Sequence, residues 1–165
     1  MKHLYAPWRG AYINRTSDSA ACIFCDAHRT STPEDSFVIE RTDLSSVLLN
    51  IYPYNPGHLL ISTARHVAEI QDLTQKERAD IMERAAQASN ILRTEFGADG
   101  INIGVNGGSA AAGGSIPDHF HLHVVPRWFG DTNFLPVIAH TKHLSADLMQ
   151  VYSALSAAWK HTQTQ

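Results

Sequence analysis

Residues 119–125 read His-Phe-His-Leu-His-Val-Val, and this stretch is the most informative part of the chain. Successive side chains of a strand point to opposite faces, so His119, His121 and His123 are expected on one face and their apolar neighbours on the other. Burying unpaired polar groups is costly, so three imidazoles in a row need hydrogen-bond partners or a ligand. The pattern therefore predicts a half-buried strand that carries a chemical site.

The chemistry of these rings has three interpretations. In the first, a neutral imidazole is a nucleophile near pH 7, and its phosphoramidate divides one displacement at phosphorus into two steps. A protonated neighbouring histidine would stabilise phosphoryl charge or protonate the leaving group. Backbone carbonyls of the glycine-rich loop over residues 106–115 would accept the Nδ1–H of the nucleophile. The other two interpretations are a three-histidine metal site and a solvated strand face that is rich in histidine.

Four further strands are expected where apolar and β-branched side chains concentrate: residues 37–40, 46–51, 58–62 and 100–105. The turn segment 52–57 separates the second of these runs from the third. It contains Pro53 and Pro56, which cannot donate to a strand ladder. The second and third strands are therefore expected to form an antiparallel pair.

Two helices are expected. Thr74 and Glu77 have the spacing of a capping box, which predicts that the first helix begins there. Apolar side chains then recur at helical spacing before Gly97, a residue type that commonly ends helices: Ile81, Ala85, Ala88, Leu92 and Phe96. The second helix is expected from about Ser145, with one apolar face: Leu148, Tyr152, Leu155 and Trp159.

This order of elements predicts an α+β fold with about five strands in a mainly antiparallel sheet, one long central helix and a C-terminal helix. At 165 residues, with 44% hydrophobic and 18% charged residues, the chain suits a single domain. Within residues 1–165 we expect an N-terminal arm (1–21), a core (22–128) and a C-terminal extension (129–165). Residues 1–35 are polar with turn formers and are expected to be irregular.

Charge and composition limit the partners. A net charge of −3 with neutral histidines argues against duplex nucleic acid and an anionic membrane surface. No apolar run approaches the roughly 20 residues of a membrane span, and residues 1–9 lack the features of a signal peptide. Cys22 and Cys25 have C-x-x-C spacing, which suits metal or redox chemistry in a reducing compartment. The expected location is therefore the cytoplasm.

Residues 119–125 resemble the signature of the histidine triad family, in which histidines alternate with apolar residues. Residues 50–61 are similar to the strand-turn-strand that precedes the triad in this family, and residues 106–115 are similar to its glycine-rich loop. Residues 5–9 and 126–134 extend the similarity toward the branch that includes bacterial diadenosine tetraphosphate phosphorylases and related hydrolases. The resemblance implies a histidine-triad-like fold.

The resemblance also implies a two-step nucleotidyl transfer. His121 would attack an α-phosphate to form a transient nucleotidyl-histidine, and His123 would contact phosphate oxygens. Diadenosine tetraphosphate is the favoured substrate, cleaved by phosphate to ADP and ATP or by water to AMP and ATP. An adenosine phosphoramidate is an alternative substrate, and a nucleotide-binding interaction module with little turnover is an alternative of another class. His58 occupies a familiar family position, where we expect a packed or hydrogen-bonded histidine.

Several nucleotide-binding residues follow from the same resemblance. Asn50 matches a position that binds ribose hydroxyls, and Asn106 and Ser115 match positions that line the phosphates. Ser115 stands where many relatives have glutamine. Asn106, Gly113 and Trp128 resemble positions that are tied to a preference for diadenosine tetraphosphate.

Some members of the family hold a structural zinc ion between a C-x-x-C, a histidine after the third strand and the first histidine of the triad. The matching residues are Cys22, Cys25, His66 and His119, so the resemblance implies structural zinc; no organic cofactor is expected. His119 is a candidate catalytic residue as a member of the triad. If zinc binds it, His119 belongs to the scaffold instead. The family likewise implies a homodimer.

Overall fold

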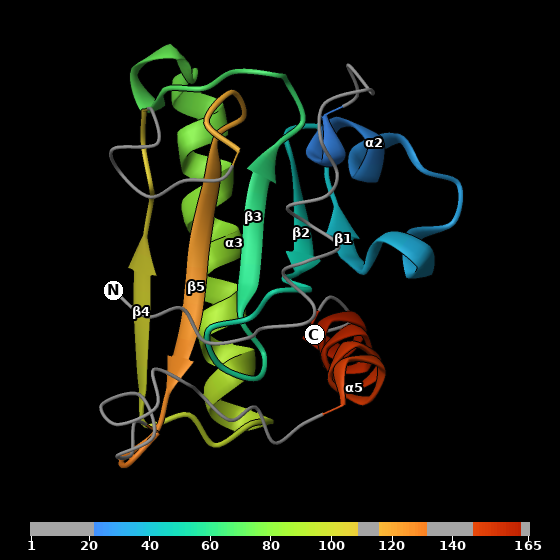
Figure 1. Ribbon diagram of the computed structural model, residues 1–165, viewed down its shortest axis with the longest axis vertical. Helices are drawn as coiled ribbons and strands as arrows, with labels where there is room; N and C mark the ends of the chain where they lie inside the picture. Colours follow the sequence, from blue (N-terminus) through green and yellow to red (C-terminus); the bar gives the residue numbers. More distant parts are fainter. Residues whose placement is uncertain (1–21, 109–115, 132–146, 163–165) are drawn as a thin grey trace, which may run out of the picture.

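The computed structural model describes residues 22–108, 116–131 and 147–162, and the elements below lie within these ranges (Figure 1). The strands are β1 (Val38–Arg41), β2 (Ser45–Leu49), β3 (Leu59–Thr63), β4 (Gly100–Gly104) and β5 (His121–Arg127). The α-helices are α2 (Ile23–Arg29), α3 (Gln75–Thr94) and α5 (Leu148–Thr162). Two short 3-10 helices span Pro33–Ser36 and Ile70–Asp72. The structure confirms the predicted α+β class.

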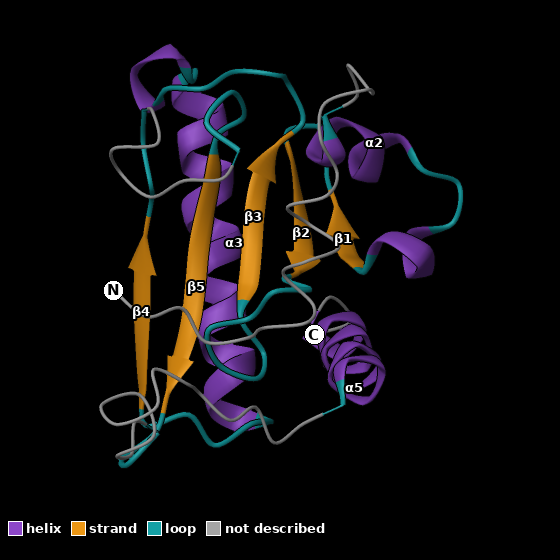
Figure 2. Ribbon diagram, viewed as in Figure 1, coloured by secondary structure: helices purple, strands orange, loops and turns teal. Residues whose placement is uncertain are grey.

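The five strands form one sheet in the order β1-β2-β3-β5-β4, and all neighbouring strands are antiparallel (Figure 2). The predicted antiparallel pair is confirmed as β2 and β3. β5 lies between β3 and β4, with Ser62 opposite His121 and Leu60 opposite His123. Because directly opposite residues point to the same face of a sheet, both histidines share the face of Leu60 and Ser62.

The other face of the sheet packs against α3 and α5, and α3 runs behind β3 and β5 in the view of Figure 1. The predicted capping box is confirmed: the Thr74 hydroxyl accepts from Glu77 N–H, and the Glu77 carboxylate accepts from Thr74 N–H. The helix ends before Phe96, which is half-buried against the same core, and Gly97 follows with a φ of 60°. Each fully buried aliphatic side chain in this core contributes about 1.5–3 kcal/mol.

A second apolar cluster lies between α2 and the first strands, and it contains Phe24, Ala27, Val38 and Leu48. The expectation that residues 1–35 are irregular is therefore wrong for residues 23–29 and 33–35. Two helical turns are too short to show a clear apolar period. Only the spacing of Phe24 and Ala27, three residues apart on one side of the helix, indicated it.

The second predicted helix is confirmed as α5, whose Tyr152, Leu155 and Trp159 are buried. Its expected start at Ser145 lies outside the described residues. None of the helices in the described part of the chain has the length and apolar content that crossing a membrane requires.

Candidate active site

His121 is the first residue of β5 and is only 8% exposed. Its Nδ1–H donates to the backbone carbonyl of His119 at 2.8 Å, so the lone pair of the neutral ring lies on Nε2. Phe24 of α2 packs on the ring, with 4.8 Å between the ring centroids. Burial lowers the pKa of His121 below its usual 6.5, which keeps the ring neutral near pH 7. Nε2 therefore has the electronic form of a nucleophile.

The acceptor for this N–H differs from the one expected from the sequence. The glycine-rich loop was expected to supply the carbonyl, whereas the structure shows the carbonyl of His119. The chain bends at His119, just before β5, and this bend brings the carbonyl to the ring. The residue that fixes the tautomer of His121 is thus its own neighbour in the triad.

His119 itself belongs to a different cluster. The residue is 1% exposed, and its Nε2–H donates to the carbonyl of Thr63 at 2.8 Å. Its Nδ1 therefore presents a lone pair to Sγ of Cys22 at 3.1 Å and Sγ of Cys25 at 3.5 Å. Nδ1 of His66 lies 3.3 Å from Sγ of Cys25. The structure thus brings together all four residues that the resemblance implied as metal ligands.

These four ligand atoms fit a single metal ion. They all lie within 4.8 Å of one another, which suits a tetrahedral zinc with ligand distances of about 2.0–2.3 Å. Cys22 is the N-cap of α2 and Cys25 lies in its first turn, while His66 follows β3 and His119 precedes β5. A metal at this cluster would therefore join α2 to two strands of the sheet.

His123 lies two residues beyond His121 on the same face and is half-buried. Its Nδ1 is 2.9 Å from Nε2 of His58, which is fully buried. Burial lowers the pKa of His123 to about 4 and the pKa of His58 to about 3. Both rings are therefore neutral at pH 7. In the substrate-free chain, neither ring is the protonated neighbour that was considered from the sequence.

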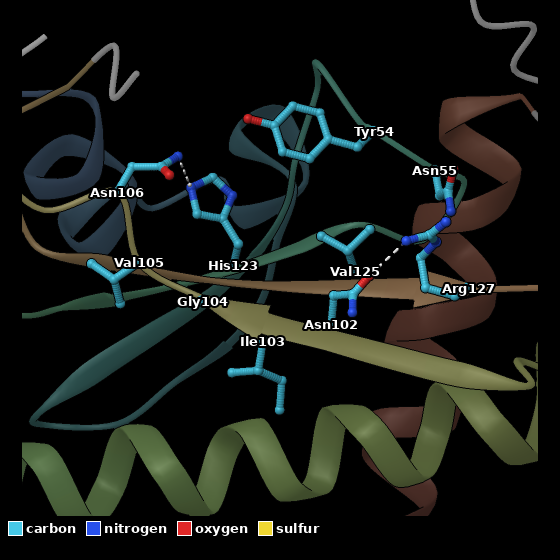
Figure 3. A pocket seen from close by; sticks show the side chains of 10 residues that line it. All are labelled: Tyr54, Asn55, Asn102, Ile103, Gly104, Val105, Asn106, His123, Val125 and Arg127. Carbon is cyan, nitrogen blue, oxygen red and sulfur yellow. Dashed lines mark hydrogen bonds between the residues drawn. The ribbon is translucent and has the colours of Figure 1, made fainter. Parts of the chain in front are cut away.

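A pocket of about 490 Å³ opens beside His123, on the side of the sheet that faces away from α3 (Figure 3). Asn106 and Tyr54 lie at the His123 end of this pocket, and Arg127 and Asn102 lie at the other end. Side chains on one face of a strand recur every two residues, so His123 and Arg127 are roughly 13 Å apart along β5. The pocket is large enough for part of a nucleotide.

The far end of the pocket is held in place by charged hydrogen bonds. Arg127 donates from Nε and Nη2 to the carboxylate of Asp131, at 2.6 and 2.9 Å, and from Nη1 to Oδ1 of Asn102 at 2.7 Å. Asn55 donates to the same carboxylate at 2.8 Å. These hydrogen bonds fix the loop at Asp131 relative to β4, through Asn102, and relative to the turn that contains Asn55.

Two of the predicted nucleotide contacts lie next to the hydrogen-bonded pair His58 and His123. The Nδ2 atom of Asn106 is 3.3 Å from Nε2 of His123, and Asn106 lines the pocket. Asn50 accepts from the N–H of Tyr52 at 2.9 Å and lies 3.1 Å from Nδ1 of His58 through its Nδ2. Both amides thus belong to the hydrogen-bond network of the triad.

The remaining predicted contacts lie elsewhere. Trp128 packs against the core on α3, and its indole N–H donates to the carbonyl of Phe96 at 3.1 Å. It is not among the residues that line the pocket. Gly113 and Ser115 lie outside the described residues.

Sequence reasoning missed two aromatic side chains at the site. Phe24 covers His121, and its place between the two cysteines of the C-x-x-C was the signal that could have placed it there. Tyr54 is 49% exposed and stacks nearly parallel on His123, with 5.9 Å between ring centroids. Tyr54 was treated only as part of a turn, because no sequence period relates it to β5.

The sequence that builds this site matches one known family over most of its length. The HIT domain family model matches residues 31–130, which is more than half of the chain. The chain belongs to this family.

Among its relatives is the AP-4-A phosphorylase of Mycobacterium tuberculosis, which is 35% identical over 167 residues covering 96% of this chain and 85% of that protein. A bis(5'-adenosyl)-triphosphatase of Dictyostelium discoideum is 36% identical over 86 residues, 52% of this chain and 56% of that protein. Both relatives are named as enzymes that act on dinucleoside polyphosphates. A Zn-bound histidine triad family protein from Mycobacterium smegmatis has the same fold, with a TM-score of 0.67, 24% identity and coverage of 87% and 96%.

Proposed function

We propose that this protein cleaves dinucleoside polyphosphates by nucleotidyl transfer, with diadenosine tetraphosphate as the favoured substrate. The observation that carries the proposal is the neutral His121, whose Nδ1–H is held by a carbonyl and whose Nε2 has no hydrogen-bond partner among the described residues. The similarity to the AP-4-A phosphorylase over 96% of the chain supports the substrate class.

The reaction would proceed in two displacements at the same phosphorus. Nε2 of His121 would bond to the α-phosphorus while the bond to the bridging oxygen breaks, which releases ATP and leaves AMP on the histidine. Inorganic phosphate would then displace the histidine and give ADP, or water would displace it and give AMP. Both routes share the first displacement, and they differ only in the second acceptor.

The residues around the nucleophile would bind the substrate. His123 and Asn106 would contact phosphate oxygens at the near end of the pocket, and Asn50 would bind ribose hydroxyls. The position of Asn106 at 3.3 Å from His123 supports this assignment. Gly113, Ser115 and Trp128 stay proposed substrate contacts on the resemblance alone.

Zinc is the metal that best fits the cluster of Cys22, Cys25, His66 and His119. Two thiols and two imidazoles are a common donor set for structural zinc, and the M. smegmatis relative is described as Zn-bound. The metal would be structural, because His119 would then serve the scaffold and leave the phosphoryl chemistry to His121. Two free thiols kept for a metal suit a reducing compartment such as the cytoplasm.

A homodimer is proposed from the exposed edge of the sheet. β4 is one of the two terminal strands of the sheet, and no strand within the described residues pairs with its outer edge. An open strand edge invites pairing with another chain. Exposed apolar side chains occur on β4 and α3: Ile103 is 46% exposed and Met82 is 57% exposed. A two-fold contact through this edge would cover both.

Purified protein incubated with diadenosine tetraphosphate, with and without inorganic phosphate, tests the proposed function when the products are separated by ion exchange. ADP and ATP formed only with phosphate would establish phosphorolysis, and AMP and ATP would establish hydrolysis. Turnover of an adenosine phosphoramidate alone would move the assignment to that substrate class. Nucleotide binding without any product would replace the enzyme by a binding module.

A further inference from the structure

His58 is a buried histidine that the proposed reaction does not use directly. It lies between the turn at Gly57 and the first residue of β3, and its side chain is fully buried. Both of its ring nitrogens have hydrogen-bond partners, and the partners differ in kind. Which nitrogen carries the hydrogen can therefore be worked out from the donors around it.

Two donors converge on Nδ1 of His58. The backbone N–H of Tyr54 donates to it at 3.1 Å, and a backbone N–H can only donate. Nδ2 of Asn50 lies 3.1 Å from the same atom. The Asn50 amide is oriented independently, because its Oδ1 accepts from the N–H of Tyr52 at 2.9 Å. Nδ1 of His58 is therefore an acceptor without a hydrogen, and the hydrogen of the neutral ring is on Nε2.

This assignment determines the next ring in the network. Nε2–H of His58 points at Nδ1 of His123, 2.9 Å away, so Nδ1 of His123 must accept and the hydrogen of His123 is on Nε2. We propose that His58 is a positioning residue that holds His123 as a neutral Nε2–H donor aimed at the phosphate oxygens. This inference rests on the proposed function for its substrate, and on the hydrogen bonds alone for its tautomer.

The opposite assignment is energetically unfavourable. If Nδ1 of His123 carried the hydrogen, Nε2 of His58 would have to accept, and its own hydrogen would move to Nδ1. That hydrogen would face the N–H of Tyr54, whose loss of an acceptor costs about 1–3 kcal/mol. A protonated His123 would also carry a hydrogen on Nδ1, so it would force the same loss on the N–H of Tyr54. The lowered pKa values of His58 and His123, caused mainly by burial, are consistent with two neutral rings.

The tautomer of His123 also sets the orientation of Asn106. Nε2 of His123 lies 3.3 Å from Nδ2 of Asn106, and two donors cannot share a hydrogen bond. On this assignment the Asn106 amide is turned from the orientation drawn in Figure 3, so that Oδ1 accepts from Nε2–H of His123 and Nδ2 can donate to a ligand. A bound phosphate would replace Oδ1 of Asn106 as the acceptor of Nε2–H of His123 and would accept a second hydrogen bond from Nδ2 of Asn106, without any positive charge on either residue.

A matched pair of substitutions separates this role from packing. In His58→Gln, the amide group reaches the position of Nε2 and can still donate to His123. In His58→Asn, the amide is shorter, so it can accept from Tyr54 but does not reach His123. Both variants replace an imidazole by an amide in the same buried space. The tautomer of His123 is read from the ¹⁵N chemical shifts of its ring in substrate-free protein, and kcat and KM are measured with diadenosine tetraphosphate.

We expect wild-type His123 to be the Nε2–H tautomer, His58→Gln to retain that form, and His58→Asn to give a mixture of tautomers. We expect kcat to fall about tenfold or more in His58→Asn, toward the 10²–10³-fold loss known for removal of a transition-state donor, and to recover most of this loss in His58→Gln, with a smaller change in KM. An Nδ1–H tautomer in the wild type would overturn the proposal even if neither variant folds.

Equal losses of kcat in the two variants, with an unchanged tautomer, would show that His58 only packs. An absence of turnover in the wild type would refute the proposed function instead, and the tautomer measurement, made without substrate, would keep its meaning. The two failures are therefore distinguishable.

Discussion

Each histidine of the triad has its hydrogen on a nitrogen chosen by a different neighbour. His119 gives its Nε2–H to Thr63 and turns Nδ1 to the cysteines. His121 gives its Nδ1–H to the carbonyl of His119 and keeps Nε2 for chemistry. His123 accepts from His58 and keeps Nε2–H. One residue type, repeated at every second position, would thus supply a metal ligand, a nucleophile and a neutral donor in the proposed reaction.

Removing the nucleophile should abolish the chemistry and spare binding. In His121→Ala we expect kcat for diadenosine tetraphosphate to fall by about 10³-fold or more, because the first displacement has no nucleophile. The dissociation constant of the substrate, measured by calorimetry, should change by less than about tenfold. His161→Ala, at an exposed position in the last turn of α5, is the control and should retain turnover. Near-normal turnover by His121→Ala would exclude a histidine intermediate at this position.

The buried rings also make stability depend on pH. The pKa values of His58 and His123 are about 3 and about 4 in the folded chain, against about 6.5 when unfolded. Below pH 6.5 the unfolded chain therefore binds protons that the folded chain does not. The contribution of these rings to the free energy of unfolding should be fully present above pH 6.5. As the pH decreases toward the folded-state pKa values, it should fall by up to about 1.4 kcal/mol per pH unit for each ring.

Urea unfolding at pH 7, 6 and 5 measures this dependence for the wild type and His58→Gln. The difference between the two proteins isolates the share of His58, because the carboxylates and metal ligands are common to both. The variant should show the shallower fall. Equal pH dependence in the two proteins would contradict a buried, neutral His58.

At the level of elements, the short helix α2 and the start of the long helix α3 both contribute to the candidate metal cluster. α2 carries both cysteines of the metal cluster. Glu77, in the first turn of α3, accepts from Arg65 at 2.7 and 2.8 Å, and Arg65 precedes the candidate ligand His66. These hydrogen bonds hold the Glu77 carboxylate ionised, with its pKa lowered to about 2. The start of α3 therefore steadies the metal cluster.

The start of α3 provides a test of this element. Thr74→Ala removes the hydroxyl that accepts from Glu77 N–H and should lower the free energy of unfolding by about 1 kcal/mol. Thr74→Ser keeps the hydroxyl and should lose clearly less. Gln75→Ala, at the exposed first position of the helix, controls for the change to alanine. Urea unfolding of the four proteins decides the point, and equal stability of Thr74→Ala and wild type would contradict the cap.

The metal cluster provides a second test at this level. In Cys22→Ser we expect zinc content, measured by elemental analysis, to fall from about one ion per chain. The melting temperature should fall by at least about 5 °C, because the ion would join α2 to the sheet. Ile23→Ala, an exposed change between the two cysteines, is the matched control. Wild-type protein that is purified without chelator and contains no zinc would refute the metal.

The sequence predicts some elements better than others, for a physical reason. α3 has a capping box and five apolar positions at one period, so its start and length follow from local chemistry. α2 has two turns and two buried residues, Phe24 and Ala27, so it has too little periodicity to be seen. In the site, Cys22 and His119 lie 97 positions apart, and only the family pattern related them before the structure placed them 3.1 Å apart.

On the scale of the whole molecule, the two faces of the sheet have separate tasks. The face toward α3 and α5 holds the main apolar core, which needs only the right pattern of side chains. The opposite face is covered by α2 near His121 and forms the pocket beyond His123. Composition and the hydrophobic period of the elements predicted the face toward α3 and α5. The second depends on strand order and on hydrogen bonds between distant segments, such as His58 with His123, which no local pattern encodes.

The outer edge of β4, which pairs with no strand in the part of the chain that the structure describes, leads to the last prediction, which concerns assembly. If two chains pair through this edge, Ile103→Glu places a charge in the contact, and burying an unpaired charge is costly enough to dissociate it. Sedimentation velocity should then show a dimer for the wild type and a monomer for the variant. Ile70→Glu adds the same charge at a 54% exposed site on the 3-10 turn before α3 and should stay dimeric. A monomeric wild type, or a variant that sediments as a dimer, would show that β4 is not the interface.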